Sequence, residues 1–237
     1  MLPPSPPMVR FDIDCERTAL LAIDLQNQFV SSSPVAAPEG SHVVARLNTL
    51  ARECRRVGIP VIWTRHVVRP DRSNAGLLAR LVPAVNDGVI DATASSAALH
   101  ASVEVSEGDI VLDKPRFGCF HGTDLGVILR SRGITTLLLG GINTNVCVDT
   151  TAREAAVRDF EVVFLADGTA NIDLPGAPGV EACSAEDLQR AVCAVMAFGF
   201  AEVVTVDVVI SRVKASGRPP SRQAAPGSSP PVAEKGA

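Results

Sequence analysis

Three polar residues follow apolar runs of the sequence and carry side chains suited to hydrolytic chemistry. Asp24 lies within ALLAIDL, Lys114 follows DIVLD, and Cys147 follows TTLLLGGINTNV. A carboxylate can take a proton, an ammonium can stabilise nearby negative charge, and a thiol can attack a carbonyl carbon. Together the three would suffice for acyl transfer through a thioester.

Taken singly, each of these residues also has an ordinary structural interpretation. An aspartate that ends a strand often forms a turn or caps a helix, and an unpaired cysteine is more often a small core residue than a nucleophile. Cys147 differs from the other five cysteines because a polar Asn-Thr-Asn segment precedes it and an amphipathic helix is expected to begin there. The start of a helix favours the thiolate, so we expect an accessible, readily ionised thiol.

The composition argues against several classes of function. The chain has 237 residues, a formal net charge of −4, and 46% hydrophobic residues. It shows no basic stripe of the kind that binds nucleic acid, and no apolar run reaches the roughly 18 to 20 residues needed to cross a bilayer. Its cysteines lack CxxC spacing, which argues against a zinc knuckle. We expect a cytoplasmic protein with a small-molecule substrate, no membrane or nucleic-acid partner, and no cofactor.

Continuous apolar runs alternate with helical patterns, which predicts an α/β fold: a three-layer sandwich around a mostly parallel six-stranded sheet. The expected strands are 19–25, 60–64, 109–112, 135–139, 161–165 and 202–206. The expected helices are 42–57 with a Ser41 cap, 123–132, about 147–159, and one capped by Ser184 that ends near Gly199. The long segment 65–108 is expected to contain one weak helix and loops that close over a site.

The chain divides into three segments. Residues 1–17 form a Pro-rich arm, 18–213 form a single α/β domain, and 214–237 form a Pro/Ser-rich tail that is predicted to be disordered. Open α/β sheets bind ligands beyond the carboxyl ends of their strands. The three chemically competent residues should therefore meet at one edge of the sheet.

Three motifs, in this order, resemble those of the isochorismatase-like cysteine hydrolases. They are Asp-x-Gln-Asn-x-Phe from Asp24, the lysine at Lys114 followed by Phe-x-Gly-Thr-x-Leu, and Gly-Gly-Ile-Asn-Thr-Asn-Val-Cys-Val around Cys147. The resemblance extends over roughly 18–206. It implies an isochorismatase-like hydrolase domain with a Rossmann-like strand order that brings the first and fourth strands together. It also implies a catalytic triad of Asp24, Lys114 and Cys147, which releases ammonia or an amine from an amide.

The resemblance further implies how a substrate is held. A cis peptide is expected between Ile142 and Asn143, with the backbone N–H groups of Asn143 and Cys147 forming an oxyanion hole. Phe29, Ile142, Asn143 and Arg116 are candidate substrate contacts, although Phe29 could equally lie in the core and Arg116 on the surface. A homodimer or homotetramer, with loops from a neighbour closing the pocket, is also implied.

The residues that follow the second expected strand bear on the branch of the family. Nicotinamidases carry a metal-binding Asp-x-His pair here, whereas this sequence has His66 and Val68. Stable transition-metal sites need three or four converging ligands, so a lone His66 predicts no metal. The TNVCV segment resembles that of ureidoacrylate and biuret hydrolases, which implies a linear ureido or carbamoyl substrate.

Three alternatives stay open at this stage. The same triad could serve a nicotinamidase-like, maleamate-type or carbamoylsarcosine-type amidase with another pocket. The chain could instead be a non-catalytic binding module that assembles through its apolar surfaces. Cys147 could also be a redox sensor, for which Cys119 in the lysine-bearing loop is the candidate resolving thiol.

Overall fold

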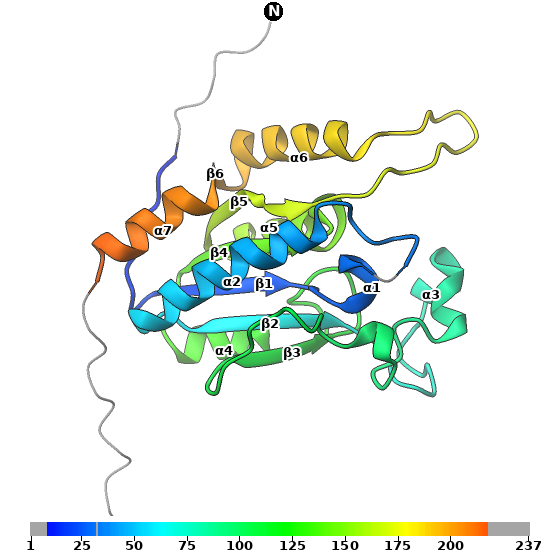
Figure 1. Ribbon diagram of the computed structural model, residues 1–237, viewed down its shortest axis with the longest axis horizontal. Helices are drawn as coiled ribbons and strands as arrows, with labels where there is room; N and C mark the ends of the chain where they lie inside the picture. The colour runs from blue at the N-terminus through cyan, green and yellow to red at the C-terminus, as the bar shows by residue number, and fades with distance from the viewer. Residues whose placement is uncertain (1–8, 32, 218–237) are drawn as a thin grey trace, which may run out of the picture.

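A computed structural model describes residues 9–31 and 33–217 of the chain, and its core is one parallel sheet (Figure 1). The strands lie in the order β3-β2-β1-β4-β5-β6. Their bounds are β1 Thr18–Ile23, β2 Val61–His66, β3 Ile110–Lys114, β4 Thr136–Ile142, β5 Glu161–Ala170 and β6 Glu202–Val204. The α/β class and the Rossmann-like strand order predicted from the sequence are confirmed.

Helices cover both faces of the sheet, so the molecule has three layers (Figure 1). The helices are α1 Asn27–Val30, α2 Gly40–Arg56, α3 Leu78–Leu81, α4 Leu125–Ser131, α5 Asp149–Ala156, α6 Ala185–Gly199 and α7 Val206–Ala215. The shorter turns are η1 Pro83–Asp87, η2 Ser95–Ala97 and η3 Thr144–Val148. Helices α2 and α7 pack on one face, and α4, α5 and α6 contribute to the core of the other.

The two central strands, β1 and β4, contain no polar side chain after their first residue because helices cover both of their faces. Leu20 and Ala22 of β1 join the core under α2, while Leu21 and Ile23 join the core under α4 and α5. Parallel strands buried on both faces read as continuous apolar runs, which is why the sequence located them. β1 pairs with β2 on one side and with β4 on the other. The strand order therefore reverses at the carboxyl end of β1.

The ends of two helices test the predicted caps. Ser184 caps α6 as predicted, since its hydroxyl accepts a hydrogen bond from the Asp187 N–H at 3.1 Å. The Ser41 cap is wrong, because α2 already begins at Gly40 and its N-cap residue is Glu39. A Cβ on Gly40 would lie 2.7 Å from the carbonyl oxygen of Val30. A close backbone approach, rather than a capping hydroxyl, thus fixes where α2 starts.

Helix α7 was not predicted. Its buried residues Val206, Val209 and Val213 follow a helical spacing and pack in the same core as α2, so the signal was present, but the predicted strand 202–206 took in Val206 and no element was predicted for 207–213. Lys214 and Ala215 belong to this helix, which corrects the predicted start of the tail at 214. The predicted disorder of the tail otherwise falls on 218–237, outside the described residues.

The described part of the N-terminal arm lies against the domain. Phe11 and Ile13 pack on the core beneath α2, and the Phe11 N–H donates to Glu202 at 2.8 Å. Segment 67–109 contains α3, η1 and η2, each five residues or shorter, with loops between them. Within residues 9–31 and 33–217, no helix has the length and apolar character required to span a membrane.

Candidate active site

The carboxylate of Asp24 lies at the carboxyl end of β1, at the point where the strand order reverses. Its backbone has φ of 55°, a left-handed conformation that is uncommon for a residue with a side chain. Thr64 of β2 holds it in place: the Thr64 hydroxyl donates to Oδ1 at 2.6 Å and accepts from the Asp24 N–H at 3.2 Å. Asp24 is completely buried, so its charge requires a partner.

Lys114, the last residue of β3, supplies that partner. It is also completely buried, and its Nζ lies 2.7 Å from Asp24 Oδ2. The ammonium donates to the carbonyl oxygens of Arg116 at 3.0 Å and Phe117 at 2.9 Å. Burial by itself would lower the pKa of Lys114, but the charge of Asp24, together with smaller contributions from Cys147 and Cys119, outweighs burial and holds that pKa above its ordinary value. Lys114 is therefore a fixed positive charge at neutral pH.

Lys114 Nζ and Asp24 Oδ2 form an ion pair at 2.7 Å, and no other described residue donates a hydrogen bond to Oδ2. Oδ1, in contrast, accepts from Thr64. The distance decides the electrostatics of the pair, because Coulomb attraction depends little on angle. Oδ2 thus keeps the capacity to receive a proton from a third group.

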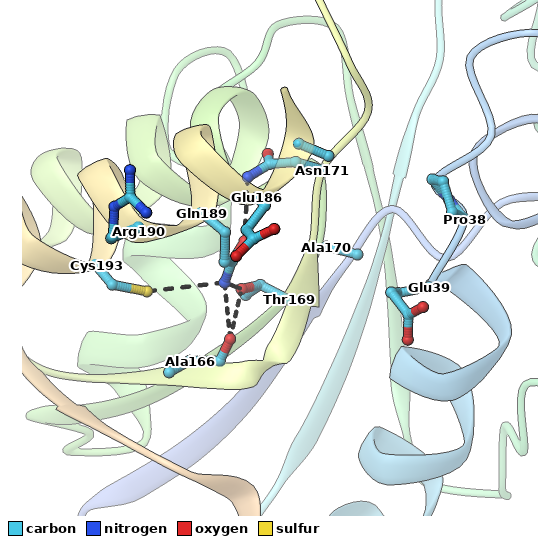
Figure 2. A pocket seen from close by; sticks show the side chains of 11 residues that line it. Pro38, Glu39, Ala166, Thr169, Ala170, Asn171, Glu186, Gln189, Arg190 and Cys193 are labelled. Atoms are coloured by element: carbon cyan, nitrogen blue, oxygen red, sulfur yellow. Dashed lines mark hydrogen bonds between the residues drawn. The ribbon is translucent and has the colours of Figure 1, made fainter. Parts of the chain in front are cut away.

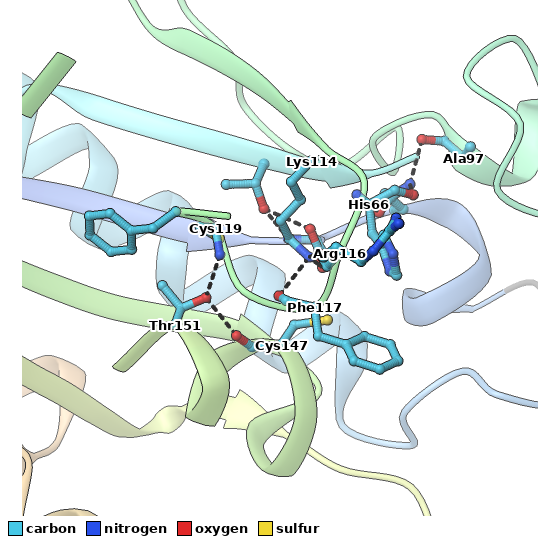
Figure 3. A network of polar contacts seen from close by, with 12 residues as sticks. His66, Ala97, Lys114, Arg116, Phe117, Cys119, Cys147 and Thr151 are labelled. Atoms are coloured by element: carbon cyan, nitrogen blue, oxygen red, sulfur yellow. Dashed lines mark hydrogen bonds and ion pairs between the residues drawn. The ribbon is translucent and has the colours of Figure 1, made fainter. Parts of the chain in front are cut away.

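Cys147 is that third group. It lies in η3, directly before α5, and its Sγ is within 4.8 Å of both a carboxylate oxygen of Asp24 and a ring nitrogen of His66. Figure 3 shows Cys147, Lys114 and His66 reaching into one region from three different elements. Sequence positions 24, 114 and 147 are thus brought together at one edge of the sheet, as the motifs predicted.

The expected accessible, ionised thiol is wrong. Only 5% of Cys147 is exposed, and burial raises the pKa of its thiol well above the ordinary range. The charge of Lys114 lowers that pKa, while the charge of Asp24 raises it. Desolvation of a thiolate therefore outweighs the favourable field at the start of the helix. In the free protein the site holds a neutral thiol beside an ion pair.

This electrostatic state predicts how alkylation of Cys147 depends on pH. A thiol whose folded pKa is raised stays protonated through neutral pH, so its labelling rate should climb steadily from roughly pH 6 to 9, past the ordinary thiol pKa of about 8.5. Peptide mass mapping after iodoacetamide treatment measures this rate at Cys147 separately from the partly exposed Cys183 and Cys193. A labelling rate that is already at its plateau below pH 7 would contradict the raised pKa.

Hydrogen bonds connect the loop that follows Lys114 to the helical turn η3, which carries Cys147. The Thr151 hydroxyl donates to the Cys147 carbonyl oxygen at 2.7 Å and accepts from the Cys119 N–H at 3.2 Å. Cys119 is completely buried, and burial raises the pKa of its thiol to about 12. Because oxidants attack exposed thiolates, two buried neutral thiols disfavour the redox-sensor alternative.

The turn between β4 and η3 has the backbone that the resemblance implied. The peptide bond between Ile142 and Asn143 is cis, which confirms that expectation. Gly141 has φ of 133° and lies so close to β1 that an added Cβ would collide with the Ile23 carbonyl oxygen. Because Gly141 has no side chain, the turn that leads to Cys147 can approach the end of β1. The roles of the Asn143 and Cys147 N–H groups as oxyanion donors stay predictions.

The other candidate substrate contacts have different surroundings. Ile142 is completely buried, and Phe29 is partly buried against the core beneath α2. Arg116 is engaged with the backbone, because its Nη1 donates to the carbonyl oxygens of Asn74 at 2.8 Å and Pro115 at 2.6 Å. This engagement fixes the loop near Asn74 beside the lysine. Substrate binding by these residues stays a prediction.

His66 belongs to the site, and its role was missed in the sequence. It is the last residue of β2, pairs in register with Lys114, and is only 4% exposed. Asp24 and Cys147 converge on it, so the view of His66 as an isolated side chain is wrong. The available signal was its position at a strand end beside Lys114. The ammonium of Lys114 next to Asp24 opposes the binding of a cation here, and the absence of a metal remains a prediction.

A second hydrogen-bond network, on the side of α6, fixes the turn that leads to Cys147 through bonds to Thr144 and Asn145. Gln189 of α6 accepts from the Thr144 hydroxyl at 2.7 Å and from Asn171 Nδ2 at 3.1 Å. Its Nε2 donates to the Ala166 carbonyl oxygen at 2.7 Å, which fixes the orientation of the amide because a carbonyl can only accept. Asn171 Oδ1 in turn accepts from the Asn145 N–H at 3.0 Å. Figure 2 shows Gln189 with its bonds to Asn171 and Ala166.

This network forms one wall of a cavity of about 490 Å³. Pro38 and Glu39 face the network across the cavity (Figure 2). None of the residues that line it is Asp24, Lys114 or Cys147. The cavity therefore lies beside the reactive groups and does not contain them.

Breaking this network should lower kcat rather than raise KM. We expect Gln189→Met and Thr144→Val each to lower kcat by about 10-fold, the value of one buried neutral hydrogen bond, with KM changed by less than about threefold. The double variant should lose little more than the worse single variant, because both changes remove the same contact. Steady-state kinetics of the four proteins measure this coupling.

Arg190→Met is the matched control for this cycle, since its exposed guanidinium pairs only with Asp187 among the described residues. Its kcat should equal that of the wild type. Additive losses in the double variant, or an equal loss in the control, would show that Gln189 acts only through the general stability of α6.

Comparisons with known proteins agree with this geometry. Residues 18–208 match the family model described as the isochorismatase domain. The chain is 34% identical over 187 residues to the ureidoacrylate amidohydrolase RutB of Methylorubrum extorquens, which covers 71% of this chain and 75% of that protein. It is 31% identical over 197 residues to nicotinamidase 3 of Arabidopsis thaliana, covering 83% of this chain and 88% of that protein.

The fold is similar to that of a solved protein over almost its whole length. The crystal structure of a cysteine hydrolase from Pseudomonas syringae pv. phaseolicola superposes with a TM-score of 0.86 at 32% sequence identity. The match covers 90% of this chain and 99% of that one. The overall fold is therefore shared with a solved relative of similar size.

Proposed function

The chain belongs to the isochorismatase family of hydrolases, and we propose that it cleaves the C–N bond of a small ureido, carbamoyl or amide compound through a thioester on Cys147. The observation that carries the proposal is the convergence of three buried groups. The Asp24–Lys114 ion pair is 2.7 Å long, and the Cys147 sulfur lies within 4.8 Å of the Asp24 carboxylate. Burying such a set of charges is costly, so a structural role alone gives a poor account of it.

In the first half of the proposed reaction, Asp24 takes the thiol proton as Cys147 attacks the substrate carbonyl carbon. The new C–S bond moves an electron pair onto the carbonyl oxygen, and the N–H groups of Asn143 and Cys147 stabilise that oxyanion. The C–N bond then breaks, and the leaving nitrogen takes the proton from Asp24. Ammonia or an amine leaves, and a thioester remains on the sulfur.

In the second half, Asp24 is again the base. It takes a proton from a water molecule, whose oxygen attacks the thioester carbonyl. The C–S bond breaks and the thiol regains its proton, which releases a carboxylic or carbamic acid. Lys114 stays charged throughout, and its ammonium stabilises the carboxylate and, during attack, the thiolate.

The raised pKa of the resting thiol fits this order of events. A neutral thiol in a dry site is protected until a substrate fills the site, and the proton then needs to move only to a carboxylate already in place. The ammonium of Lys114 lies 2.7 Å from the Asp24 carboxylate and keeps it in position to receive that proton. Proton transfer and attack are therefore expected to be coupled rather than sequential.

The ureido assignment rests on sequence similarity to a ureidoacrylate amidohydrolase, and amide hydrolysis of nicotinamide is the second candidate. The similarity to a nicotinamidase covers more of this chain, 83% against 71%. The nicotinamidase reading is weakened by His66 and Val68, which stand where that branch carries its metal-binding pair. A homodimer or homotetramer is proposed for the assembled protein.

A panel of amides tests the proposed function. Ammonia release is measured from ureidoacrylate, biuret, N-carbamoyl amino acids, maleamate and nicotinamide, with trapping of the thioester by hydroxylamine as a second readout. Turnover of a linear ureido or carbamoyl compound above the others supports the proposal. Preference for nicotinamide supports the second candidate. If no amide is turned over, both candidates are contradicted, and a non-catalytic binding module is the remaining explanation.

A further inference from the structure

We propose that His66 is a specificity-determining residue, which accepts a hydrogen bond from the N–H of the scissile amide and holds the leaving nitrogen beside Asp24. This inference deepens the proposed function and rests on it for the identity of the bond that is cleaved. Its basis is a buried polar atom of His66 that has no hydrogen-bond partner within residues 9–31 and 33–217, at the position where the substrate would react.

The position of the His66 ring is the first step. The ring nitrogen, the Asp24 carboxylate oxygen and the Cys147 sulfur lie within 4.8 Å of one another. A carbonyl carbon attacked by the sulfur, and a leaving nitrogen protonated by the carboxylate, must occupy the space among these atoms. A group bonded to that carbon is therefore within reach of the imidazole.

Packing holds the ring in this orientation. Phe117 stacks edge-on against His66 with ring centroids 5.5 Å apart and an interplanar angle of 72°. The backbone carbonyl oxygen of Phe117 accepts from Lys114, so the aromatic residue belongs to the same rigid loop. Figure 3 shows His66 and Phe117 on the side of the lysine that is nearer to the thiol. Free rotation of the imidazole away from the site is thus opposed.

The chemical state of the ring is the second step. Nε2 is buried and has no hydrogen-bond partner among the described residues. Burial, together with the positive charge of Lys114, lowers the pKa of His66 to about 3, although the negative charge of Asp24 acts in the opposite direction. The ring is therefore neutral at physiological pH. With Nε2 unpartnered, we assign the ring proton to Nδ1, on the side of the Pro115 backbone, so that the Nε2 lone pair is the acceptor.

A neutral imidazole acceptor selects a particular kind of ligand. An unsatisfied buried acceptor is costly, and a substrate N–H at the leaving nitrogen would remove that cost on binding. An ester has oxygen in place of N–H and would set two lone pairs against each other. A site built to receive a donor rejects analogues that lack it, so His66 should favour amides and ureas over the matching esters.

The test compares amide and ester cleavage in variants of this one residue. His66→Gln keeps an acceptor, while His66→Leu removes it with little change in bulk. The substrates are the best amide of the panel and the methyl ester of the same acyl group. We expect His66→Leu to lower kcat/KM for the amide about 10- to 100-fold more than for the ester, and His66→Gln to stay within about threefold of the wild type in that ratio. Equal losses on both substrates would overturn the proposal.

A second arm does not depend on turnover. Iodoacetamide carries a primary amide and methyl iodoacetate does not, so the ratio of their rates at Cys147, divided by their ratio with a free thiol, reports recognition of the N–H. This ratio should exceed one in the wild type and fall toward one in His66→Leu. If this ratio changes between the wild type and His66→Leu but no amide is turned over, the result contradicts the proposed reaction and supports His66 as an acceptor. If the ratio is unchanged in an enzyme that hydrolyses amides, the result contradicts only the proposed role of His66.

Folding is controlled in two ways. The exposed His121 gives a matched variant, His121→Leu, which should leave both ratios unchanged. Should His66→Leu fail to fold, the wild-type alkylation ratio decides by itself, and a normalised ratio of one overturns the proposal. The two arms thus separate a loss of structure from a loss of recognition.

Discussion

Replacement of Cys147 by serine is expected to reduce kcat for amide hydrolysis by about 10³-fold or more, the scale of loss seen when a covalent nucleophile is removed. A hydroxyl is far less acidic than a thiol, so Asp24 cannot deprotonate it at neutral pH. The change is nearly isosteric in a site that is almost completely buried. Ammonia release per folded protein molecule measures the effect.

The control for this substitution is Cys183→Ser, at a partly exposed cysteine between β5 and α6. Its activity should match that of the wild type. Thermal unfolding of Cys147→Ser should stay close to that of the wild type, since little volume changes. Retention of more than about a tenth of the wild-type kcat in a folded Cys147→Ser protein would exclude the thioester route.

Lys114→Met is expected to cost both activity and stability, because it leaves the charge of Asp24 buried without its partner. Removal of one member of a buried ion pair typically costs about 3 to 5 kcal/mol of unfolding free energy. The carbonyl oxygens of Arg116 and Phe117 also lose their donor. Urea denaturation at neutral pH measures the loss, and amide turnover should fall below detection.

The pH range of this effect follows from the direction of the shift. The pKa of Lys114 is raised in the folded protein, so its contribution to stability is complete below the ordinary lysine pKa of about 10.4 and is lost only as the pH rises through the folded value. The difference between wild type and Lys114→Met should therefore be constant through neutral pH and shrink only in strong base.

Two further proteins separate the ion pair from general packing. Asp24→Asn combined with Lys114→Met removes both charges, and this double variant should be more stable than Lys114→Met alone. Lys214→Met, at a lysine that is half exposed and 3.5 Å from Glu53, should cost less than about 1 kcal/mol. If the buried and the exposed lysine variants lost equal stability, the buried pair would not hold the site together.

The site also shows why its resting state is unreactive. The side chains of Asp24, His66, Lys114 and Cys147 converge on a region from which solvent is almost excluded, and the thiol remains neutral because a thiolate there would be poorly solvated. Two networks fix the reacting groups: Thr64 and Lys114 hold the carboxylate, and Gln189 with Asn171 holds the turn that carries the nucleophile. A substrate that fits between them needs few rearrangements, which favours rate over adaptability.

The sequence by itself determined the layered fold and the identity of the reacting groups. Strands buried on both faces appear as continuous apolar runs, so β1 and β4 were located to within a few residues. The motifs around Asp24, Lys114 and Cys147 then predicted which side chains meet. The boundary between the last strand and the last helix could not be predicted from the sequence, because β6 and α7 follow each other without a break in hydrophobicity.

Only the tertiary structure decided the state and surroundings of those groups. The thiol of Cys147 is neutral because atoms from distant segments exclude water, and no local pattern reports that exclusion. His66 joins the site because β2 lies between β1 and β3, and Gln189 does so because α6 packs behind the nucleophile's turn. Periodicity records which face of an element is buried, whereas desolvation and hydrogen-bond partners depend on what the folded chain places against that face.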